Sequence, residues 1–432
     1  MVKKVVIVGA GPSGLLLAHY LLRHGDNYQI DIYERRSDPR IVSFSKSRTY
    51  PISLNERGMS ALRQIDGLEA AIKAISLEMN GTVFHQRNGK TRYTPRQNPL
   101  FTLDRTNLAI ALLENLNSKY NHSQLKIHFD CQCQQVDLTD KTIKLTTIAE
   151  ESEKLFIVNY DFLVGADGAS SAVRESLNST DCFNCEQKPI TTDYKSFILP
   201  ISQENSNINL AGDKIHSWML KDGTVILLLH QLGGIMSGII HFSRQQNQIN
   251  NLATKEEVLQ LFRENFPEIG QLMPDSEAED FLHRPASTVV TVRCNSYHHG
   301  DSVLLIGDAA HAVSPSIGQG CNAALEDVLI FDQLLDKYSD NIEEAIAQFT
   351  VRRQPDGYAL VELGDNAFPL SQGLFIEFML REWMAKIIHN IFPQVFSQPL
   401  FYLISETTVP YSEILNVYQG WIAKVKKSNA NF

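Results

Sequence analysis

The chain has 432 residues, of which 43% are hydrophobic and 20% charged, proportions typical of a soluble globular protein. Its 39 Lys and Arg against 49 Asp and Glu give a net charge of −10, which argues against nucleic-acid binding. The length allows two domains or one large composite domain. Six cysteines in so long a chain do not form a disulfide framework, and we expect free thiols in a reducing environment and no metal site.

A strand, a glycine-rich turn and a helix open the chain. Residues 5–8 (VVIV) predict a buried parallel strand. Gly9, Gly11 and Gly14 then form G-x-G-x-x-G, and an amphipathic helix follows. The next strand ends in Glu34, twenty residues after Gly14, where a carboxylate can reach a ribose hydroxyl. Because such glycines let the backbone approach a pyrophosphate at a helix N-terminus, the pattern predicts dinucleotide binding.

Two further strands end in acidic residues far along the chain. One apolar strand ends in Asp167 and Gly168 and leads into a helix that carries Arg174. Another, in DSVLLIGDAAHAV, ends at Asp308. Residues 37–100 are polar and rich in arginine, so a plain nicotinamide domain is not completed early. Three strand ends with Gly or Asp favour a long, extended cofactor.

These motifs together resemble the class A FAD-dependent aromatic hydroxylases, which share the fold of p-hydroxybenzoate hydroxylase. That family combines G-x-G-x-x-G with an internal D-G and a late G-D, which stand here as Gly9-Gly11-Gly14, Asp167-Gly168 and Gly307-Asp308. The resemblance implies an α/β fold with a Rossmann-like FAD-binding domain, an antiparallel substrate-domain sheet and a helical C-terminal region.

The same resemblance assigns residues to FAD. Asp308 would hold the ribityl chain, and Glu34 the adenosine ribose. Pro315, Gly318 and Gly320 would lie against the flavin, ahead of a helix whose positive end faces the flavin pyrimidine. The other implied contacts are Ser13, Arg36, Arg48, Arg105, Cys133, Cys321 and Asn322. For Arg48 and Arg105, surface ion pairs are the alternative. We do not expect Cys321 to be a nucleophile, because this chemistry needs no protein thiol, and we expect His311 to pack and form hydrogen bonds rather than act as an acid–base catalyst.

Within this class, residues 293–341 and 391–414 resemble the kynurenine 3-monooxygenases. Two substrate contacts of that family, an Asn and a Tyr, fall on Asn366 and Tyr411.

The carboxylate clamp of that family is altered. The positions of its Arg and Tyr correspond here to Thr82 and Arg96, and Arg92 is a second candidate anchor. Losing a bidentate Arg leaves a substrate carboxylate unpaired at a cost of several kcal/mol. Either a nearby Arg compensates, or the substrate is not kynurenine.

The implied reaction is hydroxylation of a small aromatic substrate through a flavin C4a-hydroperoxide, with O₂ and NAD(P)H consumed. The resemblance favours NADPH over NADH. The alternatives are a hydroxylase of the same class with an unrelated phenolic substrate, and an FAD-binding oxidase or ligand-binding protein that does not hydroxylate. The oligomeric state stays open.

We expect a discontinuous FAD-binding domain, a substrate-domain sheet and a C-terminal helical cap. Their ranges are 1–75, 100–185 and 285–355 for the first, 76–99 and 186–284 for the second, and 356–432 for the cap. Four antiparallel strands are expected between residues 194 and 243. The longest apolar stretches near the C-terminus are shorter than the about 20 residues of a membrane span, so we expect no membrane anchor and a cytoplasmic location.

Overall fold

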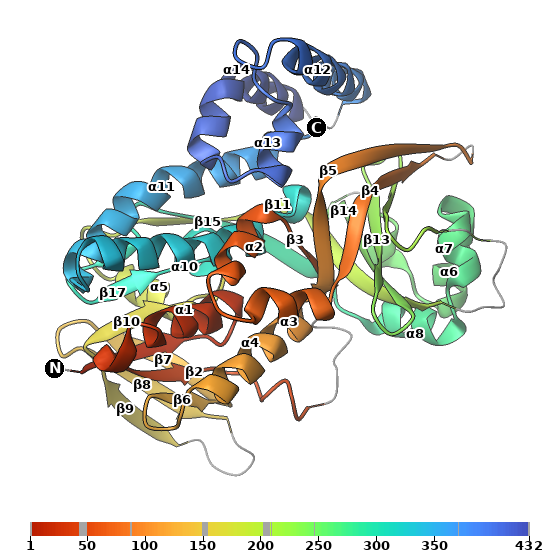
Figure 1. Cartoon of the computed structure of the whole chain (residues 1–432). Coiled ribbons are helices and arrows are strands. Elements are labelled where there is room, and N and C mark those ends of the chain that lie inside the picture. The colour runs from red at the N-terminus through yellow and green to blue at the C-terminus, as the bar shows by residue number, and fades with distance from the viewer. Residues whose placement is uncertain are drawn as a thin grey trace.

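The computed structural model describes residues 2–42, 50–86, 89–148, 154–201, 208, 210–245, 247–369 and 371–430. A parallel sheet near the N-terminus and a longer, mostly antiparallel sheet occupy different ends of the molecule, with helices packed around both (Figure 1).

The first sheet is parallel apart from its edge strand β16. Its order is β16 (His298–His299), β17 (Val303–Leu305), β10 (Phe162–Gly165), β1 (Lys3–Val8), β2 (Tyr28–Tyr33), β6 (Leu125–His128). Val5, Val6 and Ile7 are fully buried, as expected of a strand covered on both faces. The covering helices are α1 (Pro12–Leu22), α4 (Arg105–Lys119), α10 (Gly320–Lys337) and, on the opposite face, α5 (Ala172–Leu177).

The second sheet is antiparallel except where β12 pairs with β4. Its order is β15 (Ser287–Cys294), β11 (Cys185–Pro200), β14 (Ile235–Ser243), β13 (Val225–Gln231), β12 (Ile215–Met219), β4 (Leu77–His85), β5 (Thr91–Asp104), β3 (Pro51–Leu54). On its outer face, Phe197 packs edge-on against Phe262 and Phe281 of the covering helices. Those helices are α6 (Lys255–Asn265), α7 (Pro267–Leu272) and α8 (Asp275–His283) (Figure 1).

Smaller elements accompany the two large sheets. A third sheet consists of β7 (Cys131–Asp137), β8 (Thr142–Thr147) and β9 (Leu155–Asn159). The remaining short helices are α2 (Glu56–Arg63), α3 (Leu68–Ala74), α9 (Asp308–His311), and the 3₁₀ turns η1 (Gly25–Asn27), η3 (Ile249–Asn251) and η4 (Pro315–Ile317).

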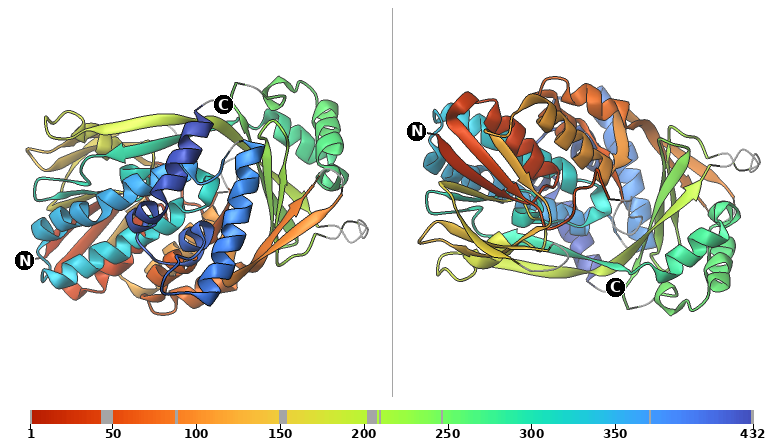
Figure 2. Two further views of the ribbon diagram at one scale, coloured as in Figure 1. Left: turned by 90° about the horizontal axis from the view of Figure 1, so that it is seen from above. Right: turned by 90° about the horizontal axis from the view of Figure 1, so that it is seen from below.

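The C-terminal helices lie over the middle of the molecule when it is seen from above (Figure 2). They are α11 (Ile342–Asn366), α12 (Gln372–Ile391), α13 (Leu400–Glu406) and α14 (Tyr411–Asn429). Their hydrophobic core also contains Ile317 of η4 and Ala323 of α10, so it is continuous with the first sheet's helices.

The expected fold class and the four antiparallel strands are confirmed. The domain boundaries stay a prediction, although β3 and β15, which that division assigns to the FAD-binding part, pair within the second sheet. None of the helices in the described residues combines the length and the apolar character that a bilayer crossing requires.

Candidate cofactor and substrate site

The three predicted strand ends lie side by side. β1 pairs with β10, and β10 pairs with β17, all in parallel, so their carboxyl ends meet at one edge of the sheet. This edge is where α/β proteins bind ligands.

The glycines of the first loop differ in what surrounds them. Gly9 has φ +107°, and a Cβ there would lie 2.5 Å from the Ala166 carbonyl oxygen. A Cβ on Gly14 would lie 2.2 Å from the Gly9 carbonyl oxygen. Gly11, in contrast, has φ −76°, and no described atom would come closer than 3.9 Å to its Cβ. Packing explains Gly9 and Gly14, whereas Gly11 leaves open space of the kind that a close-lying ligand fills.

Glu34 lies directly after β2 and turns back to the same loop. Its carboxylate accepts hydrogen bonds from the backbone amides of Ala10 (2.9 Å) and Arg36 (3.0 Å). This places the acid beside the glycine loop, where the ribose of a dinucleotide is expected.

At the end of β10, Asp167 closes the start of α5. Its Oδ2 accepts from the Ala172 amide at 2.7 Å, while Oδ1 is buried with no hydrogen-bond partner among the described residues. Arg174 joins this turn to the next strand end, because it donates to the carbonyls of Ala169 (2.5 Å) and Ala309 (3.0 Å). Gly168 has φ +82°, a conformation that favours glycine.

Asp308 begins α9 at the end of β17. Its side chain is exposed, yet the surrounding protein raises the pKa of its carboxyl by burial, and His311 and Arg105 oppose that shift. Both observations hold if Asp308 lines a deep cavity that stays open to solvent. No described residue hydrogen-bonds to it, so its carboxylate is available to a ligand.

A buried ion network holds the G-D turn in place. Asp327 of α10 accepts from the Gly307 amide at 2.8 Å and from Arg353 Nε at 2.8 Å, and its Oδ2 lies 2.7 Å from His311 Nε2. Burial opposes protonation of His311, but Asp327 outweighs it, so the pKa of His311 is raised. His311 is therefore a structural partner of Asp327, in line with the sequence expectation.

The N-termini of α1 and α10 both open toward this edge. A Cβ on Gly307 would lie 3.2 Å from Ser13 Oγ, and one on Gly320 would lie 3.9 Å from Asp308 Oδ1. Neither helix has a side-chain cap, so their first amides can bind an anionic group. Burial raises the pKa of Cys321 in the first turn of α10 to about 12, so the protonated thiol is favoured at neutral pH.

Arg105 connects the glycine loop to the second sheet. Its Nη2 is the atom 3.9 Å from a Cβ on Gly11, and its guanidinium lies 6.0 Å from the Tyr50 ring centre. The ring centre of Tyr50 lies 6.4 Å from that of Tyr194, and the ring centre of Tyr194 lies 5.8 Å from that of His241. Neither Tyr194 nor His241 was singled out in the sequence, because each stands in an ordinary strand pattern.

Three further predicted cofactor contacts are Cys133, Asn322 and Arg48. Cys133 lies on β7 with a buried thiol whose pKa burial raises to about 12, and it interacts electrostatically with Asp167. The side chain of Asn322 is engaged by the protein, with Nδ2 donating to the Ser53 carbonyl at 2.8 Å. Arg48 lies outside the described residues.

An extended dinucleotide fits these residues. The open space at Gly11, the partnerless Asp308 carboxylate, the orphaned Asp167 oxygen and two uncapped helix N-termini face one edge. They supply donors for phosphates and acceptors for hydroxyls.

The predicted substrate residues are brought together only in part. Tyr411 is fully buried, stacks on Arg57 at 4.1 Å and donates its hydroxyl to Gln319 at 3.0 Å. Asn55 Nδ2 donates to the same Gln319 oxygen (3.1 Å) and to the Ser405 carbonyl (3.1 Å). Arg96 Nη2 also donates to that carbonyl at 2.7 Å. A chain of hydrogen bonds thus joins Arg96 to Tyr411 and to the segment between η4 and α10.

The other candidates lie outside this chain of hydrogen bonds. Thr82 is paired with Thr94 and Ile215 inside the sheet, and Arg92 is exposed opposite Phe84. Asn366 hydrogen-bonds Glu362 one turn earlier in α11.

Sequence reasoning missed Asn55, Asp327 and Arg353. Asn55 stands in the stretch SLNERG (residues 53–58) and Asp327 in ALEDV (residues 324–328). Polar residues at helix starts and on helix faces are common, so the only sequence signal was their closeness to motif residues.

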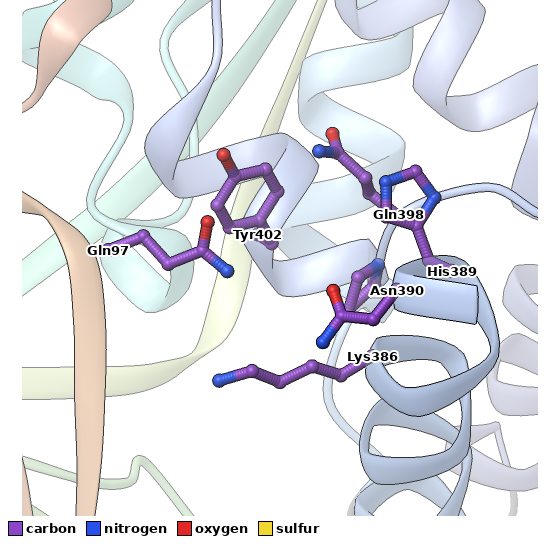
Figure 3. Close-up of a pocket in the computed structure, with 7 residues that line it drawn as sticks. Gln97, Lys386, His389, Asn390, Gln398 and Tyr402 are labelled. Atoms are coloured by element: carbon purple, nitrogen blue, oxygen red, sulfur yellow. The ribbon is translucent and has the colours of Figure 1, made fainter. Parts of the chain in front are cut away.

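A separate pocket of about 160 Å³ lies between β5 and the helices α12 and α13. Figure 3 shows Gln97 facing Tyr402, while Lys386, His389 and Asn390 extend from α12. None of the predicted site residues lines it. In the described part of the chain, no cluster of His, Cys, Asp and Glu has the arrangement of a metal site.

A Rossmann-like sheet with these three strand ends, adjoined by a long antiparallel sheet, is the fold of the FAD-dependent aromatic monooxygenases. Residues 3–362 match the FAD binding domain family. Kynurenine 3-monooxygenase of Drosophila willistoni is 30% identical over 96% of this chain and 89% of that protein. The same enzyme of Flavobacterium psychrophilum is 30% identical over 96% and 91%.

Solved structures agree on the fold. 2-Methyl-3-hydroxypyridine-5-carboxylic acid oxygenase is similar with a TM-score of 0.71 at 19% identity, covering 92% of this chain and 99% of the other. PqsL, a probable FAD-dependent monooxygenase from Pseudomonas aeruginosa, gives 0.64 at 19% identity, covering 85% and 95%. The chain belongs to the family of FAD-binding monooxygenases that contains the kynurenine 3-monooxygenases, and FAD is its cofactor.

Proposed function

We propose that the protein hydroxylates the aromatic ring of L-kynurenine, or of a close relative that keeps its carboxylate, with NADPH as electron donor. The relatives at 30% identity over nearly the whole chain support this substrate class. The observation that carries the proposal is the hydrogen-bond chain from Arg96 through Ser405 and Asn55 to Gln319, because it links a cation to the segment that begins α10.

The cofactor supplies the oxygen-transfer chemistry when bound, and the protein positions and shields it. In this proposal Gly11 would let the backbone approach the pyrophosphate, while Gly9 and Gly14 shape the loop, and Asp308 would hold the ribityl hydroxyls. The positive N-terminal end of α10 favours negative charge on the flavin ring next to Pro315 and Gly320.

Arg96 would anchor the substrate carboxylate in place of the altered clamp. Its Nε and Nη2 donate to the carbonyls of Asn98 (3.3 Å) and Ser405 (2.7 Å), which fixes the guanidinium plane. Burial lowers the pKa of Arg96, with Glu406 opposing, but guanidinium stays protonated at neutral pH. A partly desolvated cation with spare donors binds a carboxylate well.

The first test is NADPH oxidation by the FAD-loaded protein, with and without L-kynurenine, alongside product analysis. We expect strong stimulation, formation of 3-hydroxykynurenine, and weaker activity with NADH. The decarboxylated analogue of kynurenine keeps the ring, so it should bind far less tightly. Equal rates with and without L-kynurenine would contradict the proposed substrate and favour another aromatic compound.

Variants of the β4–β5 hairpin test the anchor. A hydrogen-bonded charge pair is worth about 1.5–3 kcal/mol, so Arg96→Ala should raise the KM for L-kynurenine by about 10–100-fold. Arg92→Ala is the matched control, since Arg92 is exposed on the same hairpin, and its KM should stay unchanged. A raised KM in Arg92→Ala alone would move the anchor to that residue.

A further inference from the structure

Two cysteines from distant parts of the chain face each other across neighbouring strands. Cys185 is the first residue of β11, and Cys294 is the last residue of β15. The two are direct partners in the antiparallel register, and their Sγ atoms lie 3.4 Å apart. All six cysteines are free thiols in the structure.

The antiparallel pairing of β11 with β15 places Cys185 and Cys294 at a position where opposite side chains approach most closely. The next pair along consists of Asn184 and Asn295, and the Asn295 amide donates to the Asn184 carbonyl at 2.9 Å. Hydrogen-bonded and non-hydrogen-bonded pairs alternate along an antiparallel ladder, so Cys185 and Cys294 occupy a non-hydrogen-bonded pair. Cα atoms at such positions are about 4.5 Å apart, which lies inside the range of about 4.4–6.8 Å that a disulfide spans.

The two sulfurs differ in exposure and in protonation. Cys185 is half-buried, whereas Cys294 is fully buried. A hydrogen bond from the Cys294 thiol lowers the pKa of Cys185, and the positive charge of Arg174 adds to this against the effect of burial. The same contact raises the pKa of Cys294. Cys185 is therefore the accessible, more acidic thiol, and Cys294 is its protonated neighbour.

We propose that Cys185 and Cys294 form a reversible oxidation site that hydrogen peroxide converts into a cross-strand disulfide. The Cys185 thiolate attacks one peroxide oxygen, the O–O bond breaks, and the hydroxide released takes up a proton to leave as water. The Cys294 sulfur then attacks the sulfenic sulfur of Cys185. The S–O bond breaks, the proton of Cys294 goes to the departing hydroxide, and a second water leaves. The two thiols lose two electrons, and the peroxide gains them.

The site lies beside the cofactor edge. Arg174, whose charge acts on both sulfurs, donates to the carbonyls of Ala169 and Ala309 and so connects the turns after β10 and β17. The disulfide would also close the segment between positions that are 109 residues apart. Closing so long a loop restricts the unfolded chain, so oxidation should raise the thermal midpoint.

Peptide mapping of the FAD-loaded protein tests the proposal. The protein is treated with equimolar hydrogen peroxide, alkylated with iodoacetamide in denaturant so that buried thiols also react, and digested without reductant. We expect a cross-linked peptide containing Cys185 and Cys294, protection of these two thiols from alkylation, a raised thermal midpoint, and full reversal by dithiothreitol. If both thiols are alkylated as in untreated protein, the proposal is overturned.

Three variants separate the roles. Cys294→Ser should stop at a sulfenic acid on Cys185, which dimedone traps, and Cys185→Ser should leave Cys294 reduced. Cys182→Ser is the matched control, because Cys182 is exposed and only three residues from Cys185, and it should behave as the parent protein does. A disulfide between Cys182 and Cys185 in place of the predicted one would also overturn the proposal.

Discussion

Single glycines in the first loop serve two different physical purposes. Gly9 and Gly14 are required by the protein itself, since a Cβ on either would meet backbone oxygen at 2.5 Å or 2.2 Å. Gly11 has an ordinary φ of −76° and free space around it. Packing therefore accounts for two glycines of the motif, and we propose that the space beside the third is occupied by a ligand.

This difference predicts opposite outcomes for two alanine variants. Gly11→Ala should change the unfolding free energy of the apoprotein by no more than about 1 kcal/mol, because the backbone conformation suits alanine. Its affinity for FAD should fall about tenfold or more, since the methyl group takes the space beside the pyrophosphate. Gly9→Ala should destabilise the apoprotein itself. Flavin titration and urea unfolding of apoprotein measure both quantities, and unchanged FAD affinity in Gly11→Ala would contradict the assignment.

Whole elements were predictable where the signal is local. The strand, glycine turn and helix at residues 3–22, and the start of α10 after the glycine-rich segment, follow from periodicity and turn residues. Contacts over long sequence separations were not predictable in this way. Asn55 is held in the site by partners that are distant in the sequence, such as Asn322, which is 267 residues away. The hydrogen-bond chain that begins at Arg96 likewise depends on the Ser405 carbonyl of α13. A backbone carbonyl leaves no signature in the sequence.

At the junction of α12 and α13, the carboxyl group of Glu382 should make the stability of the fold depend on pH. The Glu382 carboxylate accepts from the amides of Leu400 (2.9 Å) and Phe401 (3.1 Å) at the start of α13. Burial raises its pKa from 4.5 to about 6, against the effect of these amides. A carboxyl with a raised folded pKa stabilises the fold below its unfolded pKa and loses that contribution as pH rises through 6.

Glu382→Gln should remove this dependence. Relative to the variant, the parent protein should lose at most about 2 kcal/mol of unfolding free energy between pH 4.5 and pH 7.5. Glu377→Gln on the same helix is the control, because Lys424 and Arg381 lower the pKa of Glu377 and its contribution is lost only at lower pH. Denaturant unfolding at several pH values gives the comparison, and parallel pH profiles for the parent protein and Glu382→Gln would refute the assignment.

Across the whole molecule, the C-terminal helices and the cofactor part share one interior. Arg353 of α11 forms a buried ion pair with Asp327 of α10 at 2.8 Å, and Arg57 of α2 donates to the Val409 carbonyl at 2.6 Å just before α14. The core around Trp421 also includes residues of η4 and α10. Two parts joined by a buried ion pair and a common apolar core should unfold together.

FAD should therefore stabilise the C-terminal helices although they are remote from the glycine loop. At a free FAD concentration 100 times its Kd, the gain is about 2.7 kcal/mol. With Trp218→Phe and Trp383→Phe, Trp421 is the only one of the 3 tryptophans left, and its fluorescence reports on α14. Its thermal midpoint should rise with FAD by the same amount as the midpoint measured by calorimetry. If the thermal midpoint reported by Trp421 stays unchanged with FAD while a second calorimetric midpoint rises, the C-terminal helices unfold independently of the cofactor part.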